Sequence, residues 1–116
     1  MLIEVLKSKI HGARVTECDL DYEGSLAIPE DIIKASGLYV NEKIDVYNVT
    51  NGQRFSTYVI KAAEGLGTFM VNGAAAHLCE KGDKIIVVSY AQIYEKEIEN
   101  HRPKVLILDE YNKIVS

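Results

Sequence analysis

Short runs of β-branched and aromatic residues, separated by turn-forming residues, recur along the whole chain and restrict the folds open to it. Asn51-Gly52 separates two of these runs and predicts a hairpin with a type I′ turn, because both residues tolerate positive φ. A sheet of so few strands leaves exposed edges unless it closes on itself. The sequence therefore predicts a mainly β protein, a small barrel of six to seven strands, with strands at residues 2–10, 13–17, 43–50, 54–62, 68–71, 84–93 and 104–108.

Helical signals are few. Pro29 precedes two acidic residues, which favour a helix start, and Gly37 ends the same segment. This pattern predicts about two turns of helix with Pro29 in the first turn. Two weaker signals lie in the segments GAAAHLCEKGD and YEKEIENH. The fold class is therefore mainly β with one or two short helices.

Length and charge exclude several broad classes of protein. With 116 residues the chain is expected to form one domain, residues 1–116, and 47% hydrophobic and 26% charged residues are typical of a globular protein. The net charge of -4 gives no electrostatic basis for a nucleic-acid partner. No apolar run approaches the roughly 18 residues of a membrane span, and the N-terminal segment lacks a cleavage signal. We therefore expect no membrane association and a cytoplasmic location.

The chain carries no standard sequence signature of a metal, phosphate or serine-hydrolase site. Cys18 and Cys79 are too few for a disulfide framework and lack metal-type spacing, so reduced structural thiols are expected. Ser25 does not stand in the GxSxG sequence of a nucleophile elbow. Spacing alone therefore assigns no metal site and no catalytic triad.

Several polar residues on predicted strands share a sheet face. Lys9 and His11 alternate with one residue between them, and Arg54 shares a face with Ser56 and Tyr58. Each of these residues, taken alone, is typical of a solvated sheet face. Composition and spacing therefore lead only to a small soluble β-barrel.

Three blocks take the interpretation further. They are YEGS at Tyr22–Ser25, NVTNGQRFSTY at Asn48–Tyr58 and VNGAAAHL at Val71–Leu78, and they resemble, in the right order, blocks of the pyruvoyl-dependent aspartate 1-decarboxylase family. The similarity runs in register without a gap over residues 1–103. The resemblance implies a double-psi β-barrel, a homotetramer, and decarboxylation of L-aspartate to β-alanine for pantothenate biosynthesis.

The resemblance also implies a reason for the Gly24-Ser25 pair. Members of the family cleave their own chain at the matching bond, which here would give a small chain of residues 1–24 and a large chain of residues 25–116. Ser25 would become the pyruvoyl group, so neither a metal nor pyridoxal phosphate is expected. Thr57 is implied as the donor that stabilises the oxyanion of the cleavage step. Some relatives use a separate maturation factor.

The substrate brings two carboxylates, so its site must present cations. By resemblance, Arg54 offers a bidentate fork, Lys9 a point charge, and Tyr58 returns a proton to the carbanion left after decarboxylation. The other residues that the resemblance places at the pocket are His11, Asn72, Thr57, Gly73, Ala74 and Ala75.

The alternation of side chains along a strand conflicts with one shared site on this strand, because it puts Thr57 on the face opposite Arg54 and Tyr58. Either a bulge re-aims the strand or the site lies between subunits, and we favour the second. Two other classes stay open. The chain could be a small barrel that binds a partner without catalysis, with Gly24-Ser25 in a loop, or an N-terminal nucleophile hydrolase in which cleavage leaves the Ser25 amine intact.

Overall fold

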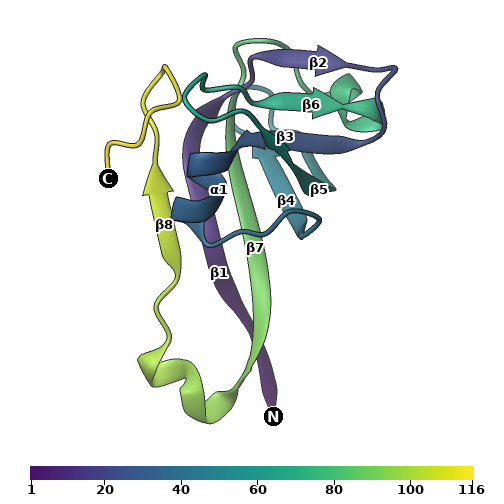
Figure 1. The fold of residues 1–116 in the computed structure, drawn as a ribbon. Helices are drawn as coiled ribbons and strands as arrows, with labels where there is room; N and C mark the ends of the chain where they lie inside the picture. The colour runs from purple at the N-terminus through teal and green to yellow at the C-terminus, as the bar shows by residue number, and fades with distance from the viewer.

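The computed structural model describes residues 1–116 and is mainly β (Figure 1). It contains eight strands, one α-helix and two 3-10 helices. In chain order these are β1 (Leu2–Arg14), β2 (Glu17–Asp19), β3 (Ser25–Pro29), α1 (Glu30–Ser36), β4 (Lys43–Asn48), β5 (Arg54–Ala62), β6 (Met70–Asn72), η1 (Gly73–Leu78), β7 (Lys84–Tyr94), η2 (Glu95–Asn100) and β8 (Lys104–Ile107).

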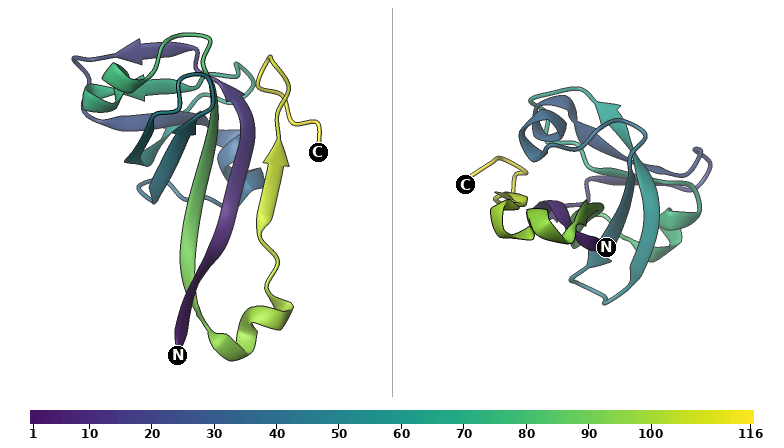
Figure 2. Two further views of the ribbon diagram at one scale, coloured as in Figure 1. Left: turned by 180° about the vertical axis from the view of Figure 1, so that it is seen from behind. Right: turned by 90° about the horizontal axis from the view of Figure 1, so that it is seen from below.

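All eight strands join in one sheet, in the order β2-β6-β3-β5-β4-β7-β1-β8. Only Val15 and Thr16 separate β1, near one end of this order, from β2 at the other end. So short a connection forces the two ends of the sheet toward each other, and the sheet curls into a barrel-like form (Figure 2). The hydrogen-bonded ladder does not close, and the curled sheet is compatible with the small, mainly β barrel expected from the sequence.

The strand count differs from the expected six to seven for identifiable reasons. The predicted break after residue 10 is wrong, because β1 continues to Arg14. Its register shifts between His11 and Ala13, where Gly12 has a φ of 89, so a bulge bends the strand without ending it. Strands β2 and β3 are additional: β2 has three exposed residues, and β3 offers only a brief apolar run before Pro29.

The predicted hairpin between β4 and β5 is confirmed, with Tyr47 paired to Arg54 in an antiparallel ladder. The predicted type I′ turn is wrong, because only Gly52 of the pair has positive φ. The Asn48 side chain explains the difference. Its Oδ1 accepts hydrogen bonds from the backbone N–H groups of Thr50 and Asn51, which shapes a longer loop.

Helix α1 confirms the predicted helical segment, although Pro29 occupies the N-cap position rather than the first turn. Gly37 ends the helix with a φ of 77. The helix buries Ile32 and Ile33, and it packs against β1, β3, β5 and β8. The main apolar cluster draws on nearly every strand and includes Ile10, Val15, Leu26, Ile28, Ile44, Val46, Val59, Phe69, Val71, Ile85, Val87 and Leu106.

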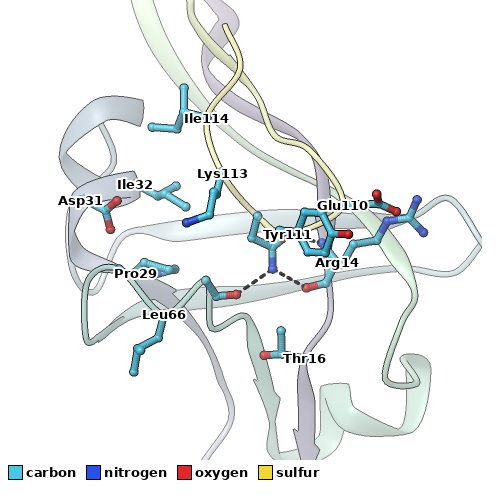
Figure 3. A pocket seen from close by; sticks show the side chains of 13 residues that line it. Arg14, Thr16, Pro29, Asp31, Ile32, Leu66, Glu110, Tyr111, Lys113 and Ile114 are labelled. Atoms are coloured by element: carbon cyan, nitrogen blue, oxygen red, sulfur yellow. Dashed lines mark hydrogen bonds between the residues drawn. The ribbon is translucent and has the colours of Figure 1, made fainter.

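The chain after β8 turns back, and the buried Asn112 holds this turn to the body of the protein. Asn112 Nδ2 donates to the carbonyl oxygens of Arg14 and Gly67, at 2.9 Å and 2.7 Å, and its Oδ1 accepts from Arg14 N–H at 2.7 Å. A pocket of about 540 Å³ lies beside this contact, between the C-terminal turn, the start of α1 and the loop around Leu66 (Figure 3). The C-terminal segment is thus part of the folded unit.

We predict that Asn112→Gly lowers the free energy of unfolding by roughly 2–4 kcal/mol, because three hydrogen bonds are lost, two of them to carbonyl groups. Asn41→Gly is the matched control, since Asn41 also has positive φ, 74 against 60, but is exposed and its side chain makes no hydrogen bond. Urea unfolding at one protein concentration measures both variants. Equal midpoints for the two variants would contradict the assigned role of the Asn112 side chain.

Candidate functional site

Ser25 lies at the start of β3 and is buried, with 1% of its surface exposed. Asn72 is its direct partner across the antiparallel pairing of β3 with β6. Asn72 Nδ2 donates to Ser25 Oγ at 3.0 Å, and the hydroxyl makes only a long contact, 3.4 Å, to the carbonyl oxygen of Glu23. Ser25 therefore has a buried amide as its neighbour and no imidazole, which is not the arrangement of a serine hydrolase.

Asn72 carries an unusual feature. It is fully buried, and its Oδ1 has no hydrogen-bond partner. Buried acceptors are nearly always paired, so this unpaired oxygen beside Ser25 is an exception.

Gly24 and Gly73 bring two pieces of backbone into close approach beside Ser25. Gly73 has a φ of 66, and a Cβ built on it would stand 2.7 Å from both Gly24 Cα and Gly24 N. Any other residue at position 73 would require the backbone around Gly24 to move. The residues that follow form η1, which packs against β2, β5 and β6 and carries Ala74, exposed, and Ala75, partly buried.

Strand β5 supplies the other nearby residues. It runs parallel to β3, and the first paired position is Leu26 with Val59, so Tyr58 and Thr57 precede this pair on β5 as Ser25 and Gly24 precede it on the other chain segment. Neighbouring strands lie about 4.8 Å apart. The expected split of this strand is confirmed, since Tyr58 is 38% exposed whereas Thr57 is half-buried on the other face.

Arg54 lies on the exposed face of β5, and its surroundings include two residues that the sequence did not indicate. Its guanidinium lies over the ring of Tyr47, 4.4 Å from the ring centre. The Tyr47 hydroxyl is 2.9 Å from that of Tyr90, and this hydrogen bond is the main cause that raises the pKa of Tyr47 to about 12. Tyr47 is therefore a neutral aromatic support under the cation, and Tyr90 holds its hydroxyl group. The sequence predicted the hairpin of β4 and β5, and the register of this hairpin puts Tyr47 beside Arg54. That pairing was the signal from which Tyr47 could have been found.

Lys9 and His11 lie on β1, and the chain does not bring them to Ser25. Strands β7, β4 and β5 stand between β1 and β3 in the sheet. His11 is in one row with Ile86, Tyr47 and Arg54, which puts it about 14 Å along the sheet from Arg54 at the usual strand spacing. Within one chain the candidate residues thus form two groups: one around Ser25 and one, with Lys9 and His11, on β1.

The surface offers no pocket that unites these groups. Five pockets lie on the chain, and none is lined by any residue expected at the site; the pocket of Figure 3 is lined instead by β1, α1 and the C-terminal turn. No three His, Cys, Asp or Glu side chains come together as metal ligands. The one α-helix is short, and no helix is long and apolar enough to cross a membrane.

The fold and the site define a class of protein: a small, curled β sheet that presents a Gly-Ser bond to a buried amide, with no Ser-His pair and no metal cluster. The family model described as aspartate decarboxylase matches residues 1–115. Three relatives named aspartate 1-decarboxylase are also similar over nearly the whole chain. The protein of Caldicellulosiruptor bescii is 54% identical, covering 99% of this chain and 90% of its own. That of Caulobacter vibrioides is 53% identical, with coverages of 98% and 97%.

The third relative, from Maricaulis maris, is 48% identical over 100% of this chain and 96% of its own. The chain therefore belongs to the aspartate decarboxylase family, as the three sequence blocks indicated. It is an enzyme, a decarboxylase, and the alternative of a barrel that only binds a partner is not favoured.

His11 generates a prediction from its electrostatic surroundings. Burial first, and then the positive charges of Lys9 and Lys84, lower the pKa of His11 from its usual 6.5, so the imidazole is neutral at pH 7. We predict that Lys84→Gln raises the pKa of His11, since one repelling cation is removed. An NMR titration of the imidazole, identified through a His11→Gln variant, measures the shift.

Lys34→Gln is the control for this titration, because Lys34 lies on α1 and pairs with Glu30. The Lys34→Gln variant is expected to leave the pKa of His11 unchanged. A Lys84→Gln protein with an unchanged His11 pKa would contradict the assigned cause.

Proposed function

We propose that this protein decarboxylates L-aspartate to β-alanine and CO2 in pantothenate biosynthesis, after cutting its own chain between Gly24 and Ser25. Family membership supports the reaction class. The single observation that supports the cleavage is the burial of Ser25 Oγ against Asn72 Nδ2, at 3.0 Å, beside the glycine approach of Gly24 and Gly73. These residues fit a pyruvoyl group derived from Ser25, because a small group there has an amide neighbour and a backbone without side chains.

In the cleavage, Ser25 Oγ attacks the Gly24 carbonyl carbon, and the bond to the Ser25 nitrogen breaks as an ester forms. Elimination then releases the Gly24 carboxylate and leaves dehydroalanine at position 25. One water hydrolyses it, so that ammonia leaves and a ketone remains. Gly24 is exposed and has no side chain to obstruct the attack.

Two residues assist this step in the proposal. Thr57, two residues before the paired Val59 on the neighbouring strand β5, is the donor assigned to the oxyanion that forms on the Gly24 carbonyl. Asn72 Nδ2 holds the Ser25 hydroxyl, and its unpaired Oδ1 is free to accept a hydrogen bond from a water or from the amine that is released. A maturation factor that distorts the Gly24-Ser25 peptide would act on the exposed residues before it.

In turnover, the pyruvoyl ketone supplies an electron sink for the electrons of the bond that breaks as CO2 leaves. The chain's own residues bind and orient the substrate. Arg54, whose guanidinium lies over the Tyr47 ring, presents a fork to one carboxylate, and Lys9 supplies a second cation. Tyr58, on the strand beside β3 and partly exposed, donates the proton that the product carbon requires.

A second copy of the chain completes the site in this proposal. Lys9 and His11 are separated from Ser25 by three strands in the order of the sheet, and the proposal takes these two residues of each site from the second chain. No pocket of one chain is lined by the site residues. In this proposal a partner subunit encloses the site and supplies its other walls. The long ribbon of β1 and β7, which projects from the curled sheet with Tyr90 and Tyr94 exposed, offers a surface for a homotetramer (Figure 2).

We predict that the purified protein consists of two chains, residues 1–24 and a chain from residue 25 that is lighter by one ammonia than a serine-started one. Ser25→Ala removes the attacking oxygen, so a single full-length chain is expected. Ser56→Ala is the control, because the Ser56 side chain is exposed and its hydroxyl donates to Asp45 on β4, so this variant should permit cleavage. The intact masses of the wild-type protein and of both variants, measured under denaturing conditions, show which chains are cut.

The same masses separate the alternatives. A cut chain that begins with an intact serine amine would identify an N-terminal nucleophile hydrolase. A wild-type chain that stays whole after prolonged warming would contradict self-cleavage.

We predict that two inactive variants, Ser25→Ala and Lys9→Ala, regain activity when they are expressed together. A mixed assembly contains sites with Ser25 from one chain and Lys9 from the other, and random mixing gives about a quarter of the wild-type sites. β-Alanine production measures the recovery. No recovery in a verified mixed assembly would place Ser25 and Lys9 of each site in the same chain.

A further inference from the structure

The residues before Ser25 lie directly on Gly73. A Cβ at position 73 would stand 2.7 Å from Gly24 Cα and Gly24 N, and 3.0 Å from the carbonyl oxygen of Tyr22. All three atoms belong to backbone, which cannot swing aside as the end of a long side chain can. The fit between this segment and the glycine therefore depends on the missing side chain.

The contact lies beside the reactive pair. Gly73 follows Asn72, whose amide binds Ser25 Oγ, and Gly24 precedes Ser25. The scissile bond is thus held at two places: the Ser25 side by the side chain of Asn72 and the pairing of β3 with β6, and the Gly24 side by its position on Gly73.

The same surface has a second use in the proposed function. There the substrate pocket includes Gly73, Ala74 and Ala75, the residues that the resemblance places at it, and Ala74 is exposed. In the uncut chain, however, the face of Gly73 is covered by residues 22–24. The substrate and this segment cannot occupy the face of Gly73 together.

We propose that Gly73 is the seat of an internal plug formed by Tyr22, Glu23 and Gly24. The seat positions the Gly24 carbonyl for attack by Ser25, and the plug keeps substrate away from Gly73 until the bond is cut. Cleavage gives the plug a free C-terminus, which lets it leave the seat. The inference rests on the proposed self-cleavage, and Gly73 acts in it as a positioning residue, through the backbone of Gly24.

The test compares two glycines of similar conformation. Gly73→Ala introduces both a strained φ, 66, and the clash with Gly24, whereas Gly52→Ala introduces the strain alone, since its φ is 79 and nothing lies within 4 Å. We expect Gly73→Ala to slow cleavage about tenfold to a hundredfold relative to Gly52→Ala, because a misplaced carbonyl is attacked slowly. Intact mass over time gives the rates, and thermal unfolding shows that both variants are folded.

The outcomes separate this inference from the proposed function. Cleavage of Gly73→Ala at the rate of Gly52→Ala overturns the seat alone. A wild-type chain that is never cut overturns the proposed function.

A second measurement covers the case in which Gly73→Ala does not fold. Succinate has two carboxylates and no amine, so it probes the substrate site without reacting with a ketone. We expect the uncut Ser25→Ala protein to bind succinate at least about tenfold more weakly than the cut wild-type protein in equilibrium dialysis, because the plug still covers the seat. Equal affinity of the two proteins overturns the plug.

Discussion

The structure depends on a covalent constraint, the two residues Val15 and Thr16 that join strands from opposite ends of the sheet order. Val15 N–H donates to the carbonyl of Asp83 and Thr16 N–H to that of Phe69, each at 2.9 Å, so the connection is tied to both sides that it joins. The curl that follows wraps the sheet around one apolar cluster. It also sets β2 beside β6, which gives β6 a neighbour on each edge and places Asn72 between Asp19 and Ser25.

Much of this fold could be predicted from the sequence, and the exceptions have a common cause. Strand β5 and the helix α1 were predicted to within a residue, because alternation and capping are local signals. Strands β2 and β3 were not, since their pairing partners β6 and β5 lie far along the chain and their own residues carry a weak pattern. The type of the turn after Asn48 was predicted wrongly for a similar reason, because the Asn48 side chain, and not the Asn-Gly pair, shapes it.

The candidate site shows the same division. The Gly24-Ser25 pair and the blocks around it could be read from the sequence by resemblance, and alternation alone separated Thr57 from Arg54 and Tyr58. The sequence could not give the stacking of Arg54 on Tyr47, or the contact between Gly24 and Gly73, because both depend on how strands or loops distant in the chain meet. Distances across a sheet follow from strand order, so the separation of Lys9 from Ser25 also required the structure.

In the proposed function, chain cleavage and decarboxylation place different demands on the residues that carry them. The proposed cleavage would occur once in the life of a molecule, so it would tolerate a buried serine without a histidine base, held by Asn72 in a place that solvent scarcely reaches. Decarboxylation recurs, so the cation and the proton donor proposed for it need access to arriving substrate, and Arg54 and Tyr58 are exposed. The alternating faces of β5 suit this division of the proposed roles, because Thr57 is half-buried on one face while its neighbour Tyr58 is exposed on the other.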